Sequence, residues 1–129
     1  MNLFKGVAEK LLNTGIKNTL QLYDKVLTEK KRRELSEKTQ IPISEIYKLT
    51  CLTDLSRIKW VNHTFAFMLY ESGYQSAVEV ANARPQVLYE SVRAFNKQHK
   101  ILRHNIGLND IKRTIEAAQG LDSDINFDQ

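Results

Sequence analysis

The densest positive charge in the chain is a run of four residues, Lys30, Lys31, Arg32 and Arg33. Lysine and arginine side chains bind phosphate oxygens, and each phosphate that they neutralise adds to the salt dependence of binding. The run would therefore suit a nucleic-acid backbone. Its alternative is a solvated helix face, since Glu29, Glu34 and Glu37 interleave the run and offset its charge. We favour the solvated face, because a dedicated phosphate surface usually excludes acidic side chains.

A second group of candidate contact residues surrounds the single tryptophan. Its members are Lys59, Trp60, Val61, Asn62, His63 and Thr64, with Arg57 just before them. An exposed Trp60 would stack on a base or anchor a protein partner. Turned inward, the same side chain would close the gap between two halves of the chain. We favour the inward position, because large aromatic side chains are highly buried on average.

A third basic stretch comprises Lys97, His99, Lys100, Arg103 and His104, followed by Lys112 and Arg113. A turn near residues 105–107 would bring these side chains onto one surface. The alternative, which we favour, is a solvated end of the domain.

The sequence predicts neither catalysis nor a metal site. Cys51 lies in an apolar segment, where a free cysteine usually behaves as a small hydrophobic residue. The chain has no nucleophile-elbow serine, phosphate loop or dinucleotide fingerprint. His99 and His104 are five residues apart, which does not align them on one helical face, and no cysteine or carboxylate joins them at ligand spacing. We therefore expect a protein without enzymatic activity, cofactor or metal.

Helices are expected to position these groups. Gly15 and Gly73 each follow a helix-forming run, where a left-handed turn needs a residue without a β-carbon. A capping box follows each glycine, at residues 18–21 and 76–79. Further helices are expected where the sequence has a start signal, at Thr28, Pro42, Pro85 and Gly107 to Asp110.

The segments around the two glycines resemble each other. "AEKLLNTGIKNTLQLY" and "AFMLYESGYQSAVEVA" keep the alanine, leucine and glycine positions at one constant offset. We interpret this as an internal duplication, with halves at about 3–55 and 56–120 that share one core in a single domain, 1–120. The acidic segment 121–129 is expected to be a flexible tail.

Length and composition fit this organisation. The 129 residues are 42% hydrophobic and carry a net charge of +4, which describes a soluble globular protein with a preference for anionic partners. The single cysteine and the lack of a secretory signal or a long apolar run indicate a cytoplasmic protein that does not associate with membranes.

The stretch from Asp54 to Leu88, together with "LLNTGIKNTLQLY" and "ELSEKTQIPISEI", resembles tandem helix-hairpin-helix proteins. In particular, it is similar to an uncharacterised bacterial family of unknown function whose members pair two such units. The resemblance covers about residues 3–118. It implies a hairpin of the type glycine–hydrophobic–glycine that binds the DNA backbone. Here the triplet is Trp60-Val61-Asn62: Val61 matches, Asn62 tolerates a left-handed backbone, and Trp60 replaces a glycine with a bulky side chain.

The sequence thus predicts an all-α fold, a compact bundle of short helices built from two helix-hairpin-helix-like (SAM-like) halves. Two functions stay open. The first is a module that binds the nucleic-acid (DNA) backbone without reading sequence, through residues 59–64 and 30–33. The second is a protein–protein interaction adaptor that has lost nucleic-acid binding and uses Trp60 as an anchor.

Overall fold

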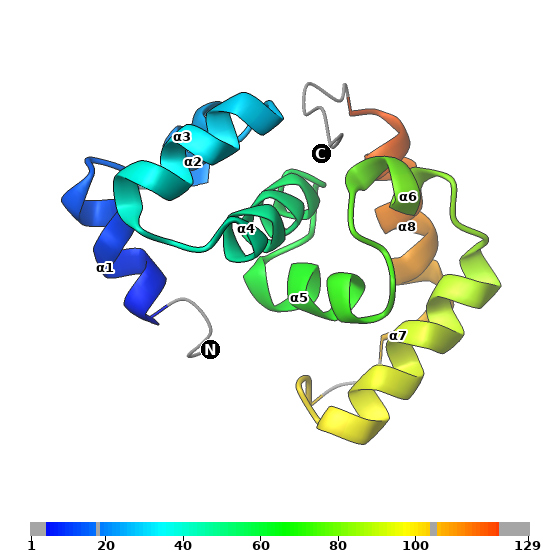
Figure 1. Ribbon diagram of the computed structural model, residues 1–129. Coiled ribbons are helices and arrows are strands. Elements are labelled where there is room, and N and C mark those ends of the chain that lie inside the picture. The colour runs from blue at the N-terminus through cyan, green and yellow to red at the C-terminus, as the bar shows by residue number, and fades with distance from the viewer. Residues whose placement is uncertain (1–4, 18, 104–105, 122–129) are drawn as a thin grey trace. The chain divides into compact units, whose positions relative to one another are not determined.

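The computed structural model describes residues 5–17, 19–103 and 106–121. Within these ranges the chain forms helices and no strand, so it is all-α, as the sequence predicts. The helices are α1 (Lys5–Asn13), α2 (Thr19–Lys25), α3 (Glu29–Thr39), α4 (Ile43–Ser56), α5 (His63–Glu71), α6 (Ala77–Ala81), α7 (Pro85–His99) and α8 (Leu108–Gln119) (Figure 1).

The starts of the later helices follow the predicted signals. The Thr28 side chain caps α3 by accepting a hydrogen bond from the amide of Lys31, at 3.2 Å. Pro42 precedes the first residue of α4, and α7 begins at Pro85, whose fixed φ suits the first turn of a helix. Gly107 precedes α8, where its amide donates to the Asp110 side chain. These four predictions are confirmed.

Both predicted glycine turns have a left-handed backbone. The φ angles are +90° at Gly15 and +101° at Gly73, a region that residues with a β-carbon rarely adopt. The amide of each glycine donates to the carbonyl three residues earlier, and the next amide donates to the carbonyl five residues earlier. The two turns therefore end their helices with the same hydrogen bonds.

The second of these turns leads into a capped helix. The Ser76 side chain accepts a hydrogen bond from the amide of Glu79, at 3.2 Å, as the capping box predicts. The Glu79 carboxylate, however, reaches back to the amide of Gln75, at 2.7 Å, one residue before the position that a capping box uses.

The first turn repeats part of this arrangement. The Gln21 side chain accepts a hydrogen bond from the amide of Lys17 at 2.7 Å. When the two similar segments are aligned, Gln21 corresponds to Glu79 and Lys17 corresponds to Gln75. The predicted cap Asn18 lies outside the described residues. The internal duplication itself stays a prediction.

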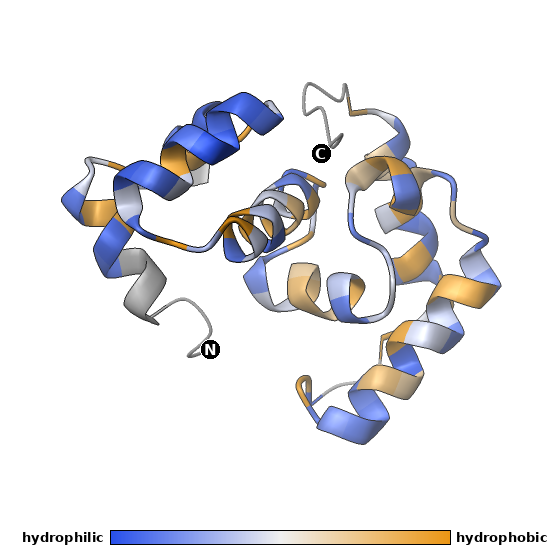
Figure 2. Cartoon of the chain, viewed as in Figure 1, coloured by the Kyte–Doolittle hydropathy of each residue, from blue (hydrophilic) through white to orange (hydrophobic). Residues whose placement is uncertain are grey.

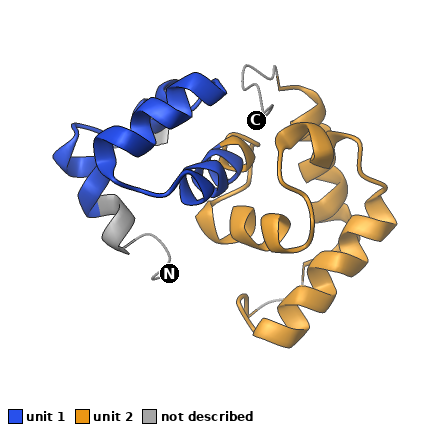
Figure 3. Ribbon diagram, in the orientation of Figure 1, with its two compact units in different colours: residues 1–53, 124–129 blue, residues 54–123 orange. Residues whose placement is uncertain are grey.

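Contacts divide the chain between Thr53 and Asp54 into two compact units (Figure 3). The boundary lies two residues before the predicted boundary between the halves. The predicted single domain stays a prediction, and residues 122–129 of the expected tail lie outside the described residues.

The first unit has an apolar core, and its most polar helix contributes only one face to it. Core residues come from α1 to α4 and the loops between them: Leu11, Ile16, Leu22, Val26, Leu35, Ile41, Ile46 and Leu49. Most of α3 is hydrophilic (Figure 2), and its buried residues are Arg32, Leu35 and Thr39. Their spacing of three and four places them on one side of the helix.

In the second unit, α8 packs against α6 and α7, and α7 also packs against α5. Gln119 of α8 donates a hydrogen bond to the carbonyl of Ala81 at the end of α6, at 3.1 Å. The rings of Phe67 and Phe95 join α5 to α7 edge to face, with centres 6.1 Å apart. Within the described ranges, no helix has the length and hydropathy that a bilayer span needs.

Candidate functional site

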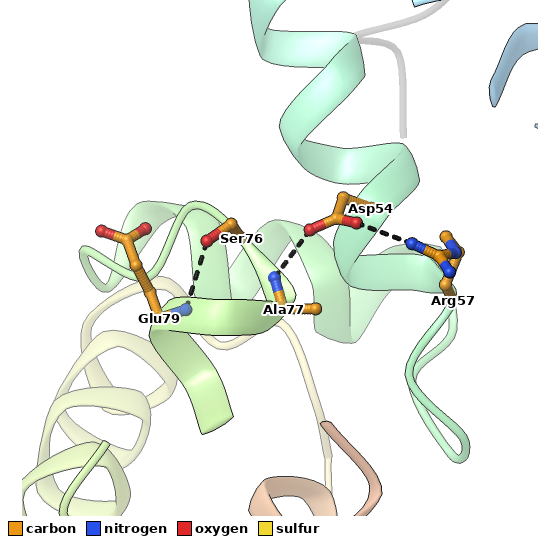
Figure 4. A network of polar contacts seen from close by, with 5 residues as sticks. All are labelled: Asp54, Arg57, Ser76, Ala77 and Glu79. Carbon is orange, nitrogen blue, oxygen red and sulfur yellow. Dashed lines mark hydrogen bonds and ion pairs between the residues drawn. The ribbon is translucent and has the colours of Figure 1, made fainter. Parts of the chain in front are cut away.

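A buried carboxylate fixes the end of α4, just before the predicted contact residues. Asp54 is fully buried and accepts two hydrogen bonds (Figure 4). One comes from the amide of Ala77 at the start of α6, at 2.8 Å, and the other from Nη1 of Arg57, at 3.1 Å. Arg57 is three-quarters buried in this ion pair, so its charge is used within the fold.

The chain then turns through residues 57–62 into α5. The amide of Val61 donates to the carbonyl of Ile58 at 3.0 Å, and the Val61 side chain is buried. Trp60 has φ +77°. Asn62 instead has an extended backbone and caps α5 by accepting a hydrogen bond from the amide of Phe65, at 2.9 Å. The left-handed residue of the turn is therefore Trp60, and Asn62 does not use the left-handed backbone that its residue type tolerates.

Trp60 points outward. Its exposed fraction is 70%, so the predicted inward packing is wrong. The left-handed backbone at Trp60 and the burial of its neighbour Val61 turn consecutive side chains in different directions, and only the smaller one enters the core. The ammonium of Lys59 lies 4.9 Å from the centre of the Trp60 ring, a cation–π distance.

His63 and Thr64 form the first turn of α5. His63 is exposed and Thr64 is half-buried. The amides of Phe65 and Ala66 donate to the side chain and the carbonyl of Asn62. Those of His63 and Thr64 make no hydrogen bond to the part of the chain that the structure describes, as is usual for the first residues of a helix.

A pocket of about 290 Å³ lies beside Trp60, within the second unit. Trp60, Asn62 and Phe65 form one side of it. Segments distant in sequence complete it, with Leu102, Ile106, Asp110, Arg113 and Thr114. We call this the Trp60 pocket. The sequence predicted none of it, because it depends on how α5 and α8 are placed.

Two sets of hydrogen bonds hold the far wall of the Trp60 pocket. The amide group of Asn96 pairs with the backbone of Leu102, with Oδ1 accepting at 2.8 Å and Nδ2 donating at 3.3 Å. At the start of α8, the Asp110 carboxylate accepts from the amide of Gly107 at 3.1 Å, and the Thr114 hydroxyl donates to the Asp110 carbonyl at 2.9 Å. The wall is thus fixed by the fold itself. Of these groups, sequence patterns had indicated only the start of α8.

The predicted cluster at residues 30–33 is divided by the fold. Lys30, Lys31 and Arg33 are exposed, whereas Arg32 has an exposed fraction of 1%. Arg32 donates from Nη1 to the carbonyl of Val26 at 2.9 Å. Burial lowers the pKa of its guanidinium, while Tyr47, Glu29 and Cys51 act in the opposite direction. Arg32 is therefore unavailable to a phosphate.

The three exposed members differ in their contacts. Arg33 forms an ion pair with Glu29 at 2.8 Å, one turn earlier. Lys31 donates to the carbonyl of Asp24 at 3.4 Å. Lys30 has no hydrogen bond or ion pair within the described ranges. All three belong to the first unit, and residues 59–64 belong to the second.

The third basic stretch falls partly at the Trp60 pocket. Lys97, His99, Lys100 and Arg103 are exposed, and His104 lies outside the described residues. Arg113 is exposed and lines the same pocket as Trp60. Arg113 makes no ion pair or hydrogen bond with any part of the chain for which the structure gives positions.

No cluster of three or more histidine, cysteine, aspartate or glutamate side chains that could hold a metal ion occurs among residues 5–17, 19–103 and 106–121. Cys51 is buried in α4. The candidate site combines the exposed indole of Trp60, the exposed side chains of Lys59 and Arg113, and the Trp60 pocket.

No curated protein and no solved structure matches the chain. The family model described as a domain of unknown function (DUF4332) matches residues 1–121, and the chain belongs to this family.

Proposed function

We propose that the protein is a non-enzymatic module that binds the phosphate backbone of nucleic acid without reading sequence. The contact surface is the turn from Lys59 to Thr64. The observation that carries this proposal is the backbone of the turn. Trp60 adopts the left-handed conformation that favours glycine, and Val61 is buried, so two features of a helix-hairpin-helix turn are present although the glycine is not.

The charge around the turn supports the proposal. No acidic residue occurs from Leu55 to Tyr70, and Lys59 and His63 are both exposed. The amides of His63 and Thr64 point out of the first turn of α5, where helix N-termini favour anions. A phosphate at this turn would meet backbone amides and a lysine, contacts that position nucleic acid and carry no sequence information.

The proposal includes an architecture of two similar halves and a location in the cytoplasm. The matching turns at Gly15 and Gly73 support two helix-hairpin-helix-like halves. The exposed side chains of Lys30, Lys31 and Arg33 would add to the attraction for phosphate. A single, buried cysteine fits a reducing compartment, and we place the protein in the cytoplasm.

A salt titration tests the proposal. Binding to a mixed-sequence DNA duplex should weaken steeply as salt rises, with a logarithmic slope of about −0.9 for each phosphate contact. Lys59→Ala should reduce the magnitude of this slope by about 0.9, which corresponds to one lost contact. Arg93→Ala, a change at an exposed arginine of α7, is the charge-matched control and should leave the slope close to that of the wild type. No binding to the duplex even at low salt overturns the proposal.

One observation favours a second candidate function, a protein–protein interaction adaptor. Trp60 is 70% exposed, and tryptophan is among the residues that contribute most to protein interfaces. In that case Trp60→Ala abolishes capture of the partner while the helical content by circular dichroism is unchanged. Loss of helical content in this variant would instead show that Trp60 supports the fold.

A further inference from the structure

The Trp60 pocket has the composition of a site for a flat aromatic ligand. Trp60 is an exposed indole at its edge, Phe65 is half-buried beside it, and Leu102 and Ile106 supply aliphatic walls. The volume of about 290 Å³ is at the small end of ligand sites, which range over roughly 300–1,000 Å³. The pocket therefore suits one small ring system and is too small for a folded segment of a partner protein.

The Trp60 pocket has charged residues of both signs in and beside its lining. Lys59, whose ammonium lies 4.9 Å from the centre of the Trp60 ring, and Arg113, which lines the pocket, are both exposed cations. From Lys97 to Arg113 the chain has five lysine or arginine residues and one acidic residue, Asp110. Asp110 itself lines the pocket, and its carboxylate would repel a phosphate placed inside. The pocket thus favours a neutral ring with hydrogen-bond donors, attached to anionic groups that remain at the rim.

Hydrogen bonds within the fold order the described part of the wall of the Trp60 pocket. Asn96 holds Leu102 by two hydrogen bonds, and the Asp110 carboxylate is oriented by the amide of Gly107. A preformed wall lowers the entropic cost of binding. Asn62, whose side chain caps α5 through Oδ1, also lines the pocket.

We propose that the Trp60 pocket binds one unpaired base of a single-stranded nucleic acid, which stacks on Trp60 while its flanking phosphates lie at Lys59 and Arg113. A nucleobase is a neutral ring with hydrogen-bond donors and acceptors along its edge, and its phosphodiester neighbours are anionic. Alternating stacking platforms and basic side chains are how proteins bind single strands without reading sequence. This inference rests on the phosphate contacts of the proposed function, rather than on duplex binding, and adds a preference for unpaired strands.

The single tryptophan of the chain makes the test direct, because any change in tryptophan fluorescence comes from Trp60. The probe is a short oligothymidylate, compared with a duplex of mixed sequence and with an oligomer of equal length made of abasic sites. The oligothymidylate should quench Trp60 and bind at least several-fold more tightly than the other two, since stacking of one base contributes about 5- to 150-fold to the affinity. The abasic oligomer keeps the phosphates and lacks the rings.

Variants measured by anisotropy of a labelled oligothymidylate complete the test. Trp60→Ala and Arg113→Ala should each weaken binding at least fivefold. Trp60→Phe, which keeps a ring, should recover most of the affinity. Arg93→Ala, at an exposed arginine that does not line the pocket, should change it less than twofold. Circular dichroism checks that each variant is folded.

The outcomes separate the two proposals. If the duplex and the abasic oligomer bind as tightly as oligothymidylate and Trp60 is not quenched, the pocket does not bind a base, and the backbone function stands. If the oligothymidylate binds with quenching and the duplex does not, the base pocket stands and binding to duplex is overturned. If none of the three binds at low salt, both proposals fall and the adaptor function takes their place.

Discussion

The carboxylate of Asp54 accepts a hydrogen bond from the backbone amide of Ala77, 23 residues later in the chain, at 2.8 Å. Both groups are buried. The bond joins the last turn of α4 to the first turn of α6. The second carboxylate oxygen of Asp54 accepts a hydrogen bond from Arg57. The Asp54 side chain therefore fixes both the helix that follows Gly73 and the entry to the turn that carries Trp60.

Replacement of Asp54 by alanine should therefore destabilise the protein strongly. It removes the acceptor of the Ala77 amide and the ion-pair partner of Arg57 Nη1, at a cost of about 3 kcal/mol in the free energy of unfolding. Ser76→Ala, which removes only the side-chain cap of the same helix, should cost about 1 kcal/mol. Urea unfolding measures both values. Glu116→Ala, at an exposed residue of α8, is the control and should stay within about 0.5 kcal/mol of the wild type. An Asp54→Ala variant as stable as the control would show that this contact does not stabilise the fold.

The two glycine turns predict a pair of equal effects. Gly15→Ala and Gly73→Ala should each reduce the free energy of unfolding by about 1–2 kcal/mol, because both residues have positive φ. The space around each glycine is open, so the cost comes from the backbone rather than from a clash. Gly120→Ala is the matched control, since Gly120 has φ −84° and should tolerate a methyl group without loss. Equal stability of all three variants would contradict the proposed role of the turns.

The basic run at residues 30–33 should divide into two kinds of position. Arg32→Ala removes a buried hydrogen bond to the Val26 carbonyl and leaves a cavity, so it should lower the free energy of unfolding by about 3 kcal/mol. Lys30→Ala should leave stability within about 0.5 kcal/mol and should weaken only the binding of nucleic acid. Thermal unfolding and the salt titration distinguish these results. A Lys30→Ala variant that unfolds as readily as Arg32→Ala would contradict this division.

The contrast between these positions shows what the sequence can predict here. Helix starts at Thr28, Pro42 and Pro85 were predictable because a cap or a proline acts within three residues of itself. The burial of Arg32 was not predictable from charge alone, because a run of four basic residues indicates a single charged surface. Its spacing from Leu35, three residues later, was an available signal that Arg32 lies on the apolar face of the helix.

The Trp60 pocket lies beyond local patterns for a different reason. Its two sides are separated by more than thirty residues of sequence, from Phe65 to Leu102, and only the packing of α5, α7 and α8 brings them together. The average burial of tryptophan predicts an inward side chain at Trp60. It does not account for the left-handed backbone of this residue, which turns the side chain outward. In a tight turn, the direction of a side chain follows from φ and ψ rather than from its hydrophobicity.

That left-handed backbone leads to a prediction about Trp60 itself. Glycine usually destabilises a protein relative to alanine, because the unfolded chain gains more freedom. At φ +77° the order should reverse: Trp60→Gly should be more stable than Trp60→Ala by about 1 kcal/mol, since only glycine adopts this region without steric cost. Urea unfolding of the two variants measures the difference. The same exchange at Ala94, an exposed position within α7, provides a reference in which Ala94→Gly should cost about 1 kcal/mol.

Trp60→Gly also introduces the residue type that the resemblance to helix-hairpin-helix proteins predicts for this turn. The variant should therefore retain binding to duplex and lose the preference for single strands. If Trp60→Gly is instead the less stable of the two variants, the left-handed turn does not form in solution, and the backbone argument for phosphate binding fails with it.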